Sequence, residues 1–131
     1  MLILTLRTDK PEAEIGLYDN EVQLEYEVWH AHRQLAETIH TKLTEVLQNT
    51  DKELQDIQGI VMFKGPGSFT GLRIGASVAD ALAYSLDIPI VGVNDGDNWQ
   101  TNGIQRLRTG ENDKIISLEY GSPARTTQQK K

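Results

Sequence analysis

Gly65-Pro66-Gly67-Ser68-Phe69-Thr70-Gly71-Leu72-Arg73-Ile74-Gly75 is the stretch that decides the fold, because a glycine-rich loop leads directly into an apolar helix there. The preceding residues, 57–63, form a β-branched, apolar run that predicts a short buried strand. Ser68 or Thr70 is expected to cap the helix by accepting a hydrogen bond from a free amide of its first turn. The pattern therefore predicts a strand, a tight turn and a helix in immediate succession.

A glycine loop at a helix N-terminus can also bind a phosphate, since its amides attract anions. A dinucleotide fingerprint requires G-x-G-x-x-G, and here the third glycine falls one residue late. A P-loop requires Gly-Lys followed by Ser or Thr, where this chain has Gly71-Leu72-Arg73. The spacing favours a structural joint over a phosphate site. The residues assigned to this joint are Gly65, Pro66, Gly67, Ser68, Thr70, Gly71 and Gly75.

The surrounding pattern predicts the order of the other elements. Residues 31–48 carry apolar side chains at three- and four-residue spacing, which indicates an amphipathic helix, and Asp19-Asn20 is a good hairpin turn. A second helix is expected over Phe69–Leu86, inside a right-handed strand-helix-strand unit. The expected strands are residues 2–6, 12–18, 22–29, 57–63 and 89–94. This order predicts an α/β fold, a single actin-like or ribonuclease-H-like (ASKHA) subdomain with a five-stranded mixed sheet and two main helices.

The glycine motif and its flanks resemble the bacterial TsaB (YeaZ) family, the non-catalytic subunit of the machinery that makes threonylcarbamoyladenosine in tRNA. Ile60-Val61-Met62-Phe63 matches the family's strand before the motif, and residues 76–86 match the helix after it. Residues 88–93 match the next strand, usually written IPLVGV. The match is specific over residues 29–94. The resemblance implies that this chain is not an enzyme and acts as a scaffold or dimerisation subunit beside a TsaD-like threonylcarbamoyltransferase.

The helix over Phe69–Leu86 has few polar positions and is expected to be covered on two sides. The residues alone leave open whether the helix over 31–48 covers its second side or whether an apolar surface remains. In the resembled family these two helices pair with a homologous catalytic subunit or with a second copy. The resemblance thus implies a contact surface formed by Leu35, Ile39, Leu43, Phe69, Leu72, Arg73, Ala76, Ala79, Leu82 and Ala83.

The chain departs from the family after residue 94. Residues 1–94 are expected to form the actin-like N-terminal subdomain, whereas longer family members continue into a second one. Residues 95–113 are rich in Asn, Asp, Gly and Thr and predict mostly loop, with a short element at 104–107. A hydrophobic run over 115–123 and the basic end Lys130-Lys131 resemble the family's C-terminal tail. Residues 95–131 are therefore predicted to replace the second subdomain, through an internal deletion.

No cofactor site is expected in this chain. The turn Arg7-Thr8-Asp9-Lys10-Pro11 after the first strand lacks the glycines of ATP-binding relatives, so the resemblance places ATP and metal in the partner. The chain has no cysteine, and its three histidines are not spaced as metal ligands. Residues 94–99 faintly resemble a calcium loop, but the order of ligands is wrong. Ser68 lies outside a G-x-S-x-G elbow, so capping explains it better than catalysis.

Composition limits the partners. The 131 residues carry a net charge of -6 and so lack the basic surface that grips nucleic acid, and tRNA is expected to be reached only through the complex. No signal peptide or membrane-spanning run is apparent, which predicts a cytoplasmic protein without membrane contact. The expected partners are a TsaD-like catalytic subunit, a TsaE-like ATPase and a second copy of the chain. The alternatives are a self-associating homodimeric module and an actin-like ATP-dependent enzyme or peptidase.

Overall fold

The structure is a computed structural model that describes residues 1–94 and 96–118. The predicted strands and the two main helices are confirmed, and the helix after the glycine motif has the expected bounds. The helix expected from residue 31 begins instead as a 3-10 turn. Residue 95 and the predicted basic tail over 119–131 lie outside the described residues. In chain order the elements are β1 (Leu2–Arg7), β2 (Glu12–Asp19), β3 (Val22–His30), η1 (His32–Gln34), α1 (Leu35–Asn49), η2 (Leu54–Asp56), β4 (Gly59–Phe63), α2 (Phe69–Leu86), β5 (Ile90–Val93) and α3 (Trp99–Arg108).

The five strands form one mixed sheet in the order β3-β2-β1-β4-β5. The first three strands pair antiparallel as a meander, with the β2–β3 turn at Asn20 in the left-handed region at φ 53°. Strand β4 lies parallel to both β1 and β5, and α2 makes the crossover between β4 and β5. The five-stranded mixed sheet expected from the sequence is confirmed.

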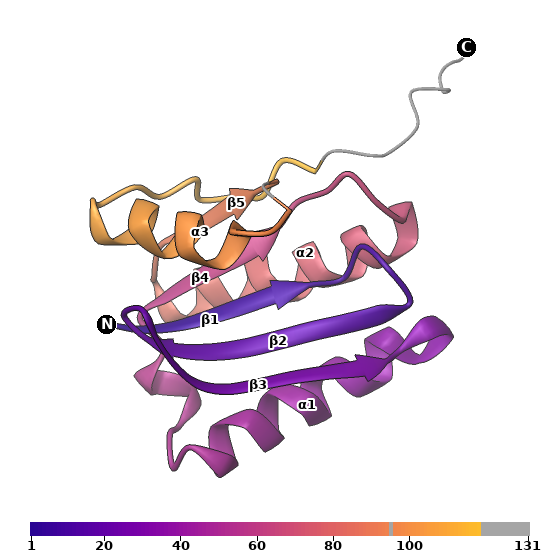
Figure 1. The fold of residues 1–131 in the computed structure, drawn as a ribbon, viewed down its shortest axis with the longest axis horizontal. Helices are drawn as coiled ribbons and strands as arrows, with labels where there is room; N and C mark the ends of the chain where they lie inside the picture. The colour runs from indigo at the N-terminus through magenta and orange to yellow at the C-terminus, as the bar shows by residue number, and fades with distance from the viewer. Residues whose placement is uncertain (95, 119–131) are drawn as a thin grey trace.

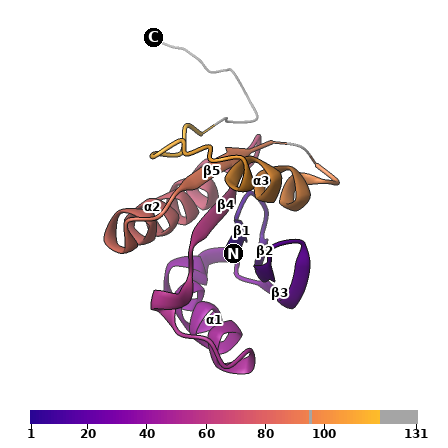
Figure 2. The ribbon, with the colours of Figure 1, turned by 90° about the vertical axis from the view of Figure 1, so that its left-hand side faces the viewer.

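Helices cover both faces of the sheet. Figures 1 and 2 show α1 and α2 on one face and α3 on the other. The alternation along β1 divides the core accordingly, because Leu2, Leu4 and Leu6 belong to the cluster under α1 and α2, whereas Ile3 joins the cluster under α3. The molecule therefore has three layers and two apolar cores that share one sheet.

The prediction that residues 95–113 are mostly loop was wrong, because a third helix lies there in addition to the two main ones. Helix α3 spans ten of these residues, Trp99–Arg108. The Trp99 ring packs edge to face on Phe63 with 6.0 Å between centroids. A Cβ at Gly103 would overlap Val61, so this glycine lets the helix lie close to β4. Tertiary packing thus makes a helix from a segment whose local preference is weak.

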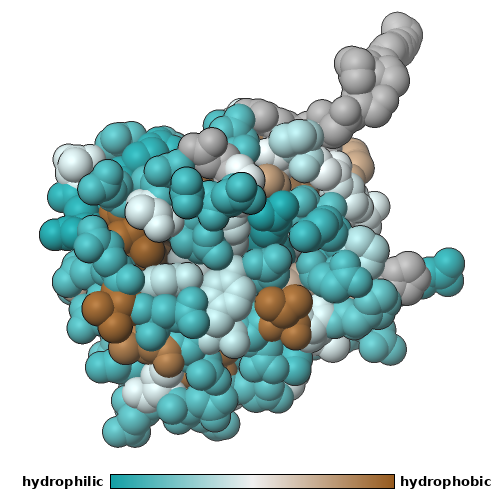
Figure 3. All heavy atoms as spheres, viewed as in Figure 1, coloured by the Kyte–Doolittle hydropathy of each residue, from teal (hydrophilic) through white to brown (hydrophobic). Residues whose placement is uncertain are grey.

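A polar contact joins α3 to β2 and β3. The Tyr26 hydroxyl on β3 donates to Glu14 on β2 and accepts a hydrogen bond of 2.9 Å from the Gln100 amide on α3. Burial and the neighbouring Glu14 carboxylate raise the pKa of Tyr26, which keeps the hydroxyl protonated as a donor. Figure 3, in the view of Figure 1, shows the side of the molecule that carries α3 as largely hydrophilic with separate hydrophobic patches. Side chains of β3 that remain exposed include Val22, Leu24 and Val28.

One carboxyl on α2 gives stability a specific pH dependence. Asp80 is partly buried, and its Oδ1 accepts a hydrogen bond of 3.1 Å from the Ile116 amide. Burial raises the pKa of Asp80 above its ordinary value of 3.8, and the Ile116 amide opposes that shift only in part. The folded protein therefore holds this proton at pH values where the unfolded chain has released it. The stability that Asp80 contributes is present in full below pH 3.8 and is lost as pH rises through the raised pKa.

We expect Asp80→Asn to remove this dependence, since an amide oxygen can accept from Ile116 without carrying charge. The free energy of unfolding of the variant should gain on that of the wild type as pH rises from 3.8 toward 7. Urea unfolding at a series of pH values measures the difference, with the exposed Asp97→Asn as a control of equal charge change. If the unfolding free energy of the variant minus that of the wild type falls as pH rises, the assignment is contradicted.

Candidate partner-binding surface

The glycine motif packs against the Thr8–Asp9 turn, which follows β1. The Ser68 amide donates to the Asp9 carbonyl at 2.9 Å, and the Thr8 hydroxyl donates to the Gly71 carbonyl at 2.8 Å. A Cβ at Gly67 would overlap Asp9, and one at Gly71 would overlap the Thr8 carbonyl oxygen. The space that a phosphate would need beside these glycines is therefore filled by the chain's own backbone.

The seated turn is held from both sides. Arg7 donates to both carboxylate oxygens of Asp9, at 2.7 and 3.1 Å, and its guanidinium lies 3.9 Å from the centroid of the Phe63 ring. Both Thr8 and Asp9 are buried. Of the two residues predicted to cap α2, Ser68 is the N-cap, since its hydroxyl accepts a hydrogen bond of 3.4 Å from the Gly71 amide. The joint is thus a packed connection between β1, β4 and α2.

A groove runs along the outer surface between α1 and α2, and we call it the α1–α2 groove. At the end of the groove near the N-terminus of α2, Phe69 is 47% exposed, and the Arg73 guanidinium lies 5.1 Å from the centroid of the Phe69 ring. The floor contains the partly buried side chains of Ile74, Val78 and Leu82, which also pack against the core under the helices. The lining residues are Ala36, His40, Phe69, Thr70, Arg73, Ile74, Ser77, Val78, Ala81, Leu82 and Ser85.

Only part of the predicted contact surface lies in this groove. Phe69, Arg73 and Leu82 line it. The others are not available to a partner, because α1 and α2 use their most apolar stripes to cover the chain's own sheet. Ala79 has no exposed surface and so offers no contact to a partner. The predicted residues buried in the chain's own core are Leu35, Ile39, Leu43, Leu72, Ala76, Ala79 and Ala83.

Sequence reasoning missed most of the groove lining. The missed α2 residues follow the same helical periodicity as the buried stripe, displaced to the adjoining face. Ser77, Ala81 and Ser85 recur every four residues on one side of α2, and Ala36 and His40 do so on α1. This pattern of small and polar residues beside an apolar stripe was the available signal.

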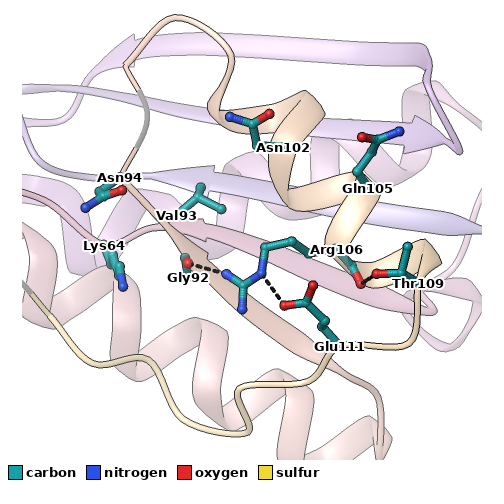
Figure 4. Close-up of a pocket in the computed structure, with 9 residues that line it drawn as sticks. All are labelled: Lys64, Gly92, Val93, Asn94, Asn102, Gln105, Arg106, Thr109 and Glu111. Atoms are coloured by element: carbon teal, nitrogen blue, oxygen red, sulfur yellow. Dashed lines mark hydrogen bonds and ion pairs between the residues drawn. The ribbon is translucent and has the colours of Figure 1, made fainter.

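A second hollow lies beside β5 and α3 (Figure 4). Its volume is about 600 Å³, whereas the two adjoining parts of the α1–α2 groove have volumes of about 450 and about 400 Å³. Its lining is polar, and the central Arg106 already donates to the Gly92 carbonyl and to Glu111, each at 2.7 Å. Because Arg106 is already bonded within the chain and the lining is more polar than that of the groove, the groove is the better candidate for a binding surface.

The part of the chain that the structure describes has neither a cluster of metal-binding side chains nor a membrane-spanning helix. In residues 1–94 and 96–118, no three side chains among His, Cys, Asp and Glu gather closely enough to hold a metal ion. Within the same ranges no helix combines the length and apolarity needed to cross a bilayer. The weak calcium-loop pattern includes residue 95 and so falls partly outside the described ranges.

The sheet order, the crossover helix and the glycine joint define an α/β protein of the ribonuclease-H-like, actin-like class. A model of the family described as "TsaD: tRNA N6-adenosine threonylcarbamoyltransferase" matches residues 29–105. The chain belongs to this family of threonylcarbamoyladenosine proteins, in which its curated relatives include both TsaB and TsaD.

Three relatives show the extent of the likeness. The TsaB protein of Bacillus subtilis is 48% identical over 58 residues, which are 44% of this chain and 25% of that protein. The threonylcarbamoyltransferase of Methylobacillus flagellatus is 34% identical over 110 residues, covering 72% of this chain and 32% of that protein. The structure of YeaZ from Pseudomonas aeruginosa superposes with a TM-score of 0.67 at 26% identity, covering 72% of this chain and 44% of that one. The chain spans less than half the length of these relatives.

Proposed function

We propose that the chain is a non-catalytic scaffold subunit in the synthesis of N6-threonylcarbamoyladenosine in tRNA. In this proposal it binds a TsaD-like threonylcarbamoyltransferase through the α1–α2 groove. The observation that carries the proposal is the groove itself, an open surface with an apolar floor and an exposed Phe69–Arg73 pair at one end. The family relationship supports the choice of partner, since a TsaB protein and a tRNA N6-adenosine threonylcarbamoyltransferase are both similar to this chain in sequence.

The groove has the physical character of a helix-docking surface. Ser77, Ala81 and Ser85 are short side chains along one rim, so the backbone of a partner helix can come close. Ile74, Val78 and Leu82 supply apolar area that a partner would remove from water. Aromatic and arginine side chains, such as those of Phe69 and Arg73, are enriched at protein–protein interfaces.

A scaffold role also agrees with how the chain uses its glycine loop. The Thr8–Asp9 turn occupies the space beside Gly67 and Gly71, so the loop serves packing. We expect ATP and a metal ion to act in the catalytic partner, with tRNA bound only through the assembled complex. The net charge of -6 favours this indirect contact. In the same proposal the complex is cytoplasmic, and a TsaE-like ATPase is a further partner.

Ser77→Arg tests the groove. Ser77 is exposed on the groove rim, so a long cation there should obstruct a docking helix without disturbing the core. We expect the Kd for the TsaD-like subunit of the same organism to rise at least about tenfold, equivalent to about 1.4 kcal/mol. Calorimetry measures the affinity, and circular dichroism confirms that the variant is folded.

Thr101→Arg is the matched control, because it adds the same charge at an exposed position of α3 on the opposite face of the sheet. Its affinity should equal that of the wild type. Equal binding by the Ser77→Arg variant would remove the groove from the proposal. Light scattering without the catalytic subunit identifies the homodimeric alternative. Tight binding of ATP and magnesium to the isolated chain would favour the enzyme alternative.

A further inference from the structure

Strand β5 lies at one edge of the sheet and pairs with β4 on its inner side. The Lys64 amide donates to the Val93 carbonyl, so Val93 directs that group toward β4. Alternate residues of a parallel strand direct their backbone groups to opposite sides, so Ile90 and Gly92 direct theirs outward. The outer edge of β5 therefore presents two amides and two carbonyls, from Ile90 and Gly92.

Each of these four groups has a hydrogen-bond partner outside the sheet. The Ile90 amide donates to Asn112 Oδ1 at 3.1 Å, and the Ile90 carbonyl accepts from the Asp113 amide at 2.8 Å. The Gly92 amide donates to Asp113 Oδ2 at 2.8 Å, and the Gly92 carbonyl accepts from Arg106 Nη1 at 2.7 Å. One segment together with one arginine thus replaces a neighbouring strand.

The covering segment, residues 111–116, is here called the edge strap. Arg106 ties it to α3 through bonds of 2.7 Å to Glu111 and to Asp113, and its side chain extends across the hollow in Figure 4. At the far end Ile116 is buried in the core, and its amide donates to Asp80 on α2. Figure 1 shows the segment running alongside β5. The edge strap is therefore anchored to both neighbouring helices.

We propose that the edge strap guards β5 against strand addition by another chain. An open edge of unpaired backbone groups is a template for pairing with a second chain, and proteins commonly protect such edges with charges or a covering segment. The sequence of β5, Ile-Val-Gly-Val, carries no charge of its own. The opposite edge strand, β3, has Glu25 and Glu27 among its residues and so carries its own protection. The edge strap thus gives β5 the protection that its uncharged sequence does not provide.

The test is the double variant Asn112→Ala/Asp113→Ala in the full chain, which removes the acceptors of both outward amides. Hydrogen exchange at Ile90 and Gly92 should accelerate by at least about tenfold, because the amides lose their partners. Light scattering should then show concentration-dependent association. The double variant and its controls are all made in a chain that also carries Ser77→Arg, so that association through the α1–α2 groove does not contribute. The result is therefore independent of whether the proposed function is correct.

Glu111→Ala is the matched control, since it removes an acid that contacts Arg106 but no group of β5. It should leave the two amides protected and the chain no more associated than its background. A double variant with fast exchange at Ile90 and Gly92 that stays monomeric at the same concentrations would overturn the guarding role. If circular dichroism shows the double variant unfolded, Asn112→Ala and Asp113→Ala are measured singly. Each should expose one amide and increase association, and unchanged association in both would also overturn it.

Discussion

Replacing Trp99 with alanine is expected to lower the free energy of unfolding by about 3–5 kcal/mol. The side chain is 2% exposed and packs edge to face on Phe63 in the core beneath α3. Its removal takes apolar area out of that core and leaves a cavity that neighbouring Ile104 and Leu107, on the same helix, can fill only in part. Urea unfolding followed by circular dichroism measures the loss.

Tyr84→Ala provides the contrast, because this α2 side chain is also aromatic but 90% exposed. Its effect should stay within about 0.5 kcal/mol, as for most surface substitutions. A cost for Trp99→Ala no larger than that for Tyr84→Ala would mean that residues 99–108 do not form a packed layer. The expectation from sequence, a loop in this region, would then be correct after all.

Gly71→Ala is expected to destabilise the chain by about 1–3 kcal/mol, as overpacking against fixed atoms does. The added Cβ would overlap the Thr8 carbonyl oxygen, which belongs to the backbone and cannot rotate away. Alanine favours helices over glycine by about 1 kcal/mol, so helix propensity alone predicts the opposite sign. The sign of the change in thermal or urea unfolding therefore reports whether the Thr8–Asp9 turn is seated on α2.

The control is Gly96→Ala, where a Cβ would meet no heavy atom within 4 Å. We expect it to be neutral or slightly stabilising, because it restricts the unfolded chain. A stabilising Gly71→Ala would show that the turn can withdraw from the joint. The space beside Gly67 and Gly71 would then be open to a ligand, and the phosphate alternative would return.

Much of the fold could be predicted because local patterns and the sheet agree. Alternation over β2 and β3, the turn at Asp19-Asn20 and the apolar run of β4 each indicate the element that forms. Helix α3 could not be predicted in the same way, since its interior Gly103 and polar residues do not favour a helix on their own. That glycine becomes favourable only against Val61, a contact between segments far apart in the chain.

The helices that form the candidate groove could be named from the sequence, but only some of the residues that line it could. The sequence points to α1 and α2, but an apolar helix stripe does not state which side of it faces the sheet. Ala79 looked like a partner contact and is fully buried, whereas Ser77, two positions earlier, lines the groove. The direction of each side chain depends on how α2 is rotated about its axis, and the seating of Gly71 and Gly75 on Thr8 determines that rotation.

The sequence by itself determined the order of the five strands and of α1 and α2, the position of the tight joint at Gly65 to Gly75 and the family to which the chain belongs. These follow from local periodicity, turn chemistry and a contiguous motif. Only the tertiary structure decided that Thr8 and Asp9 fill the glycine loop, that α3 covers the second face, and that Arg106, Asn112 and Asp113 close the edge of β5. Each of these depends on atoms that are distant in the chain and adjacent in space, a relation that no local pattern records.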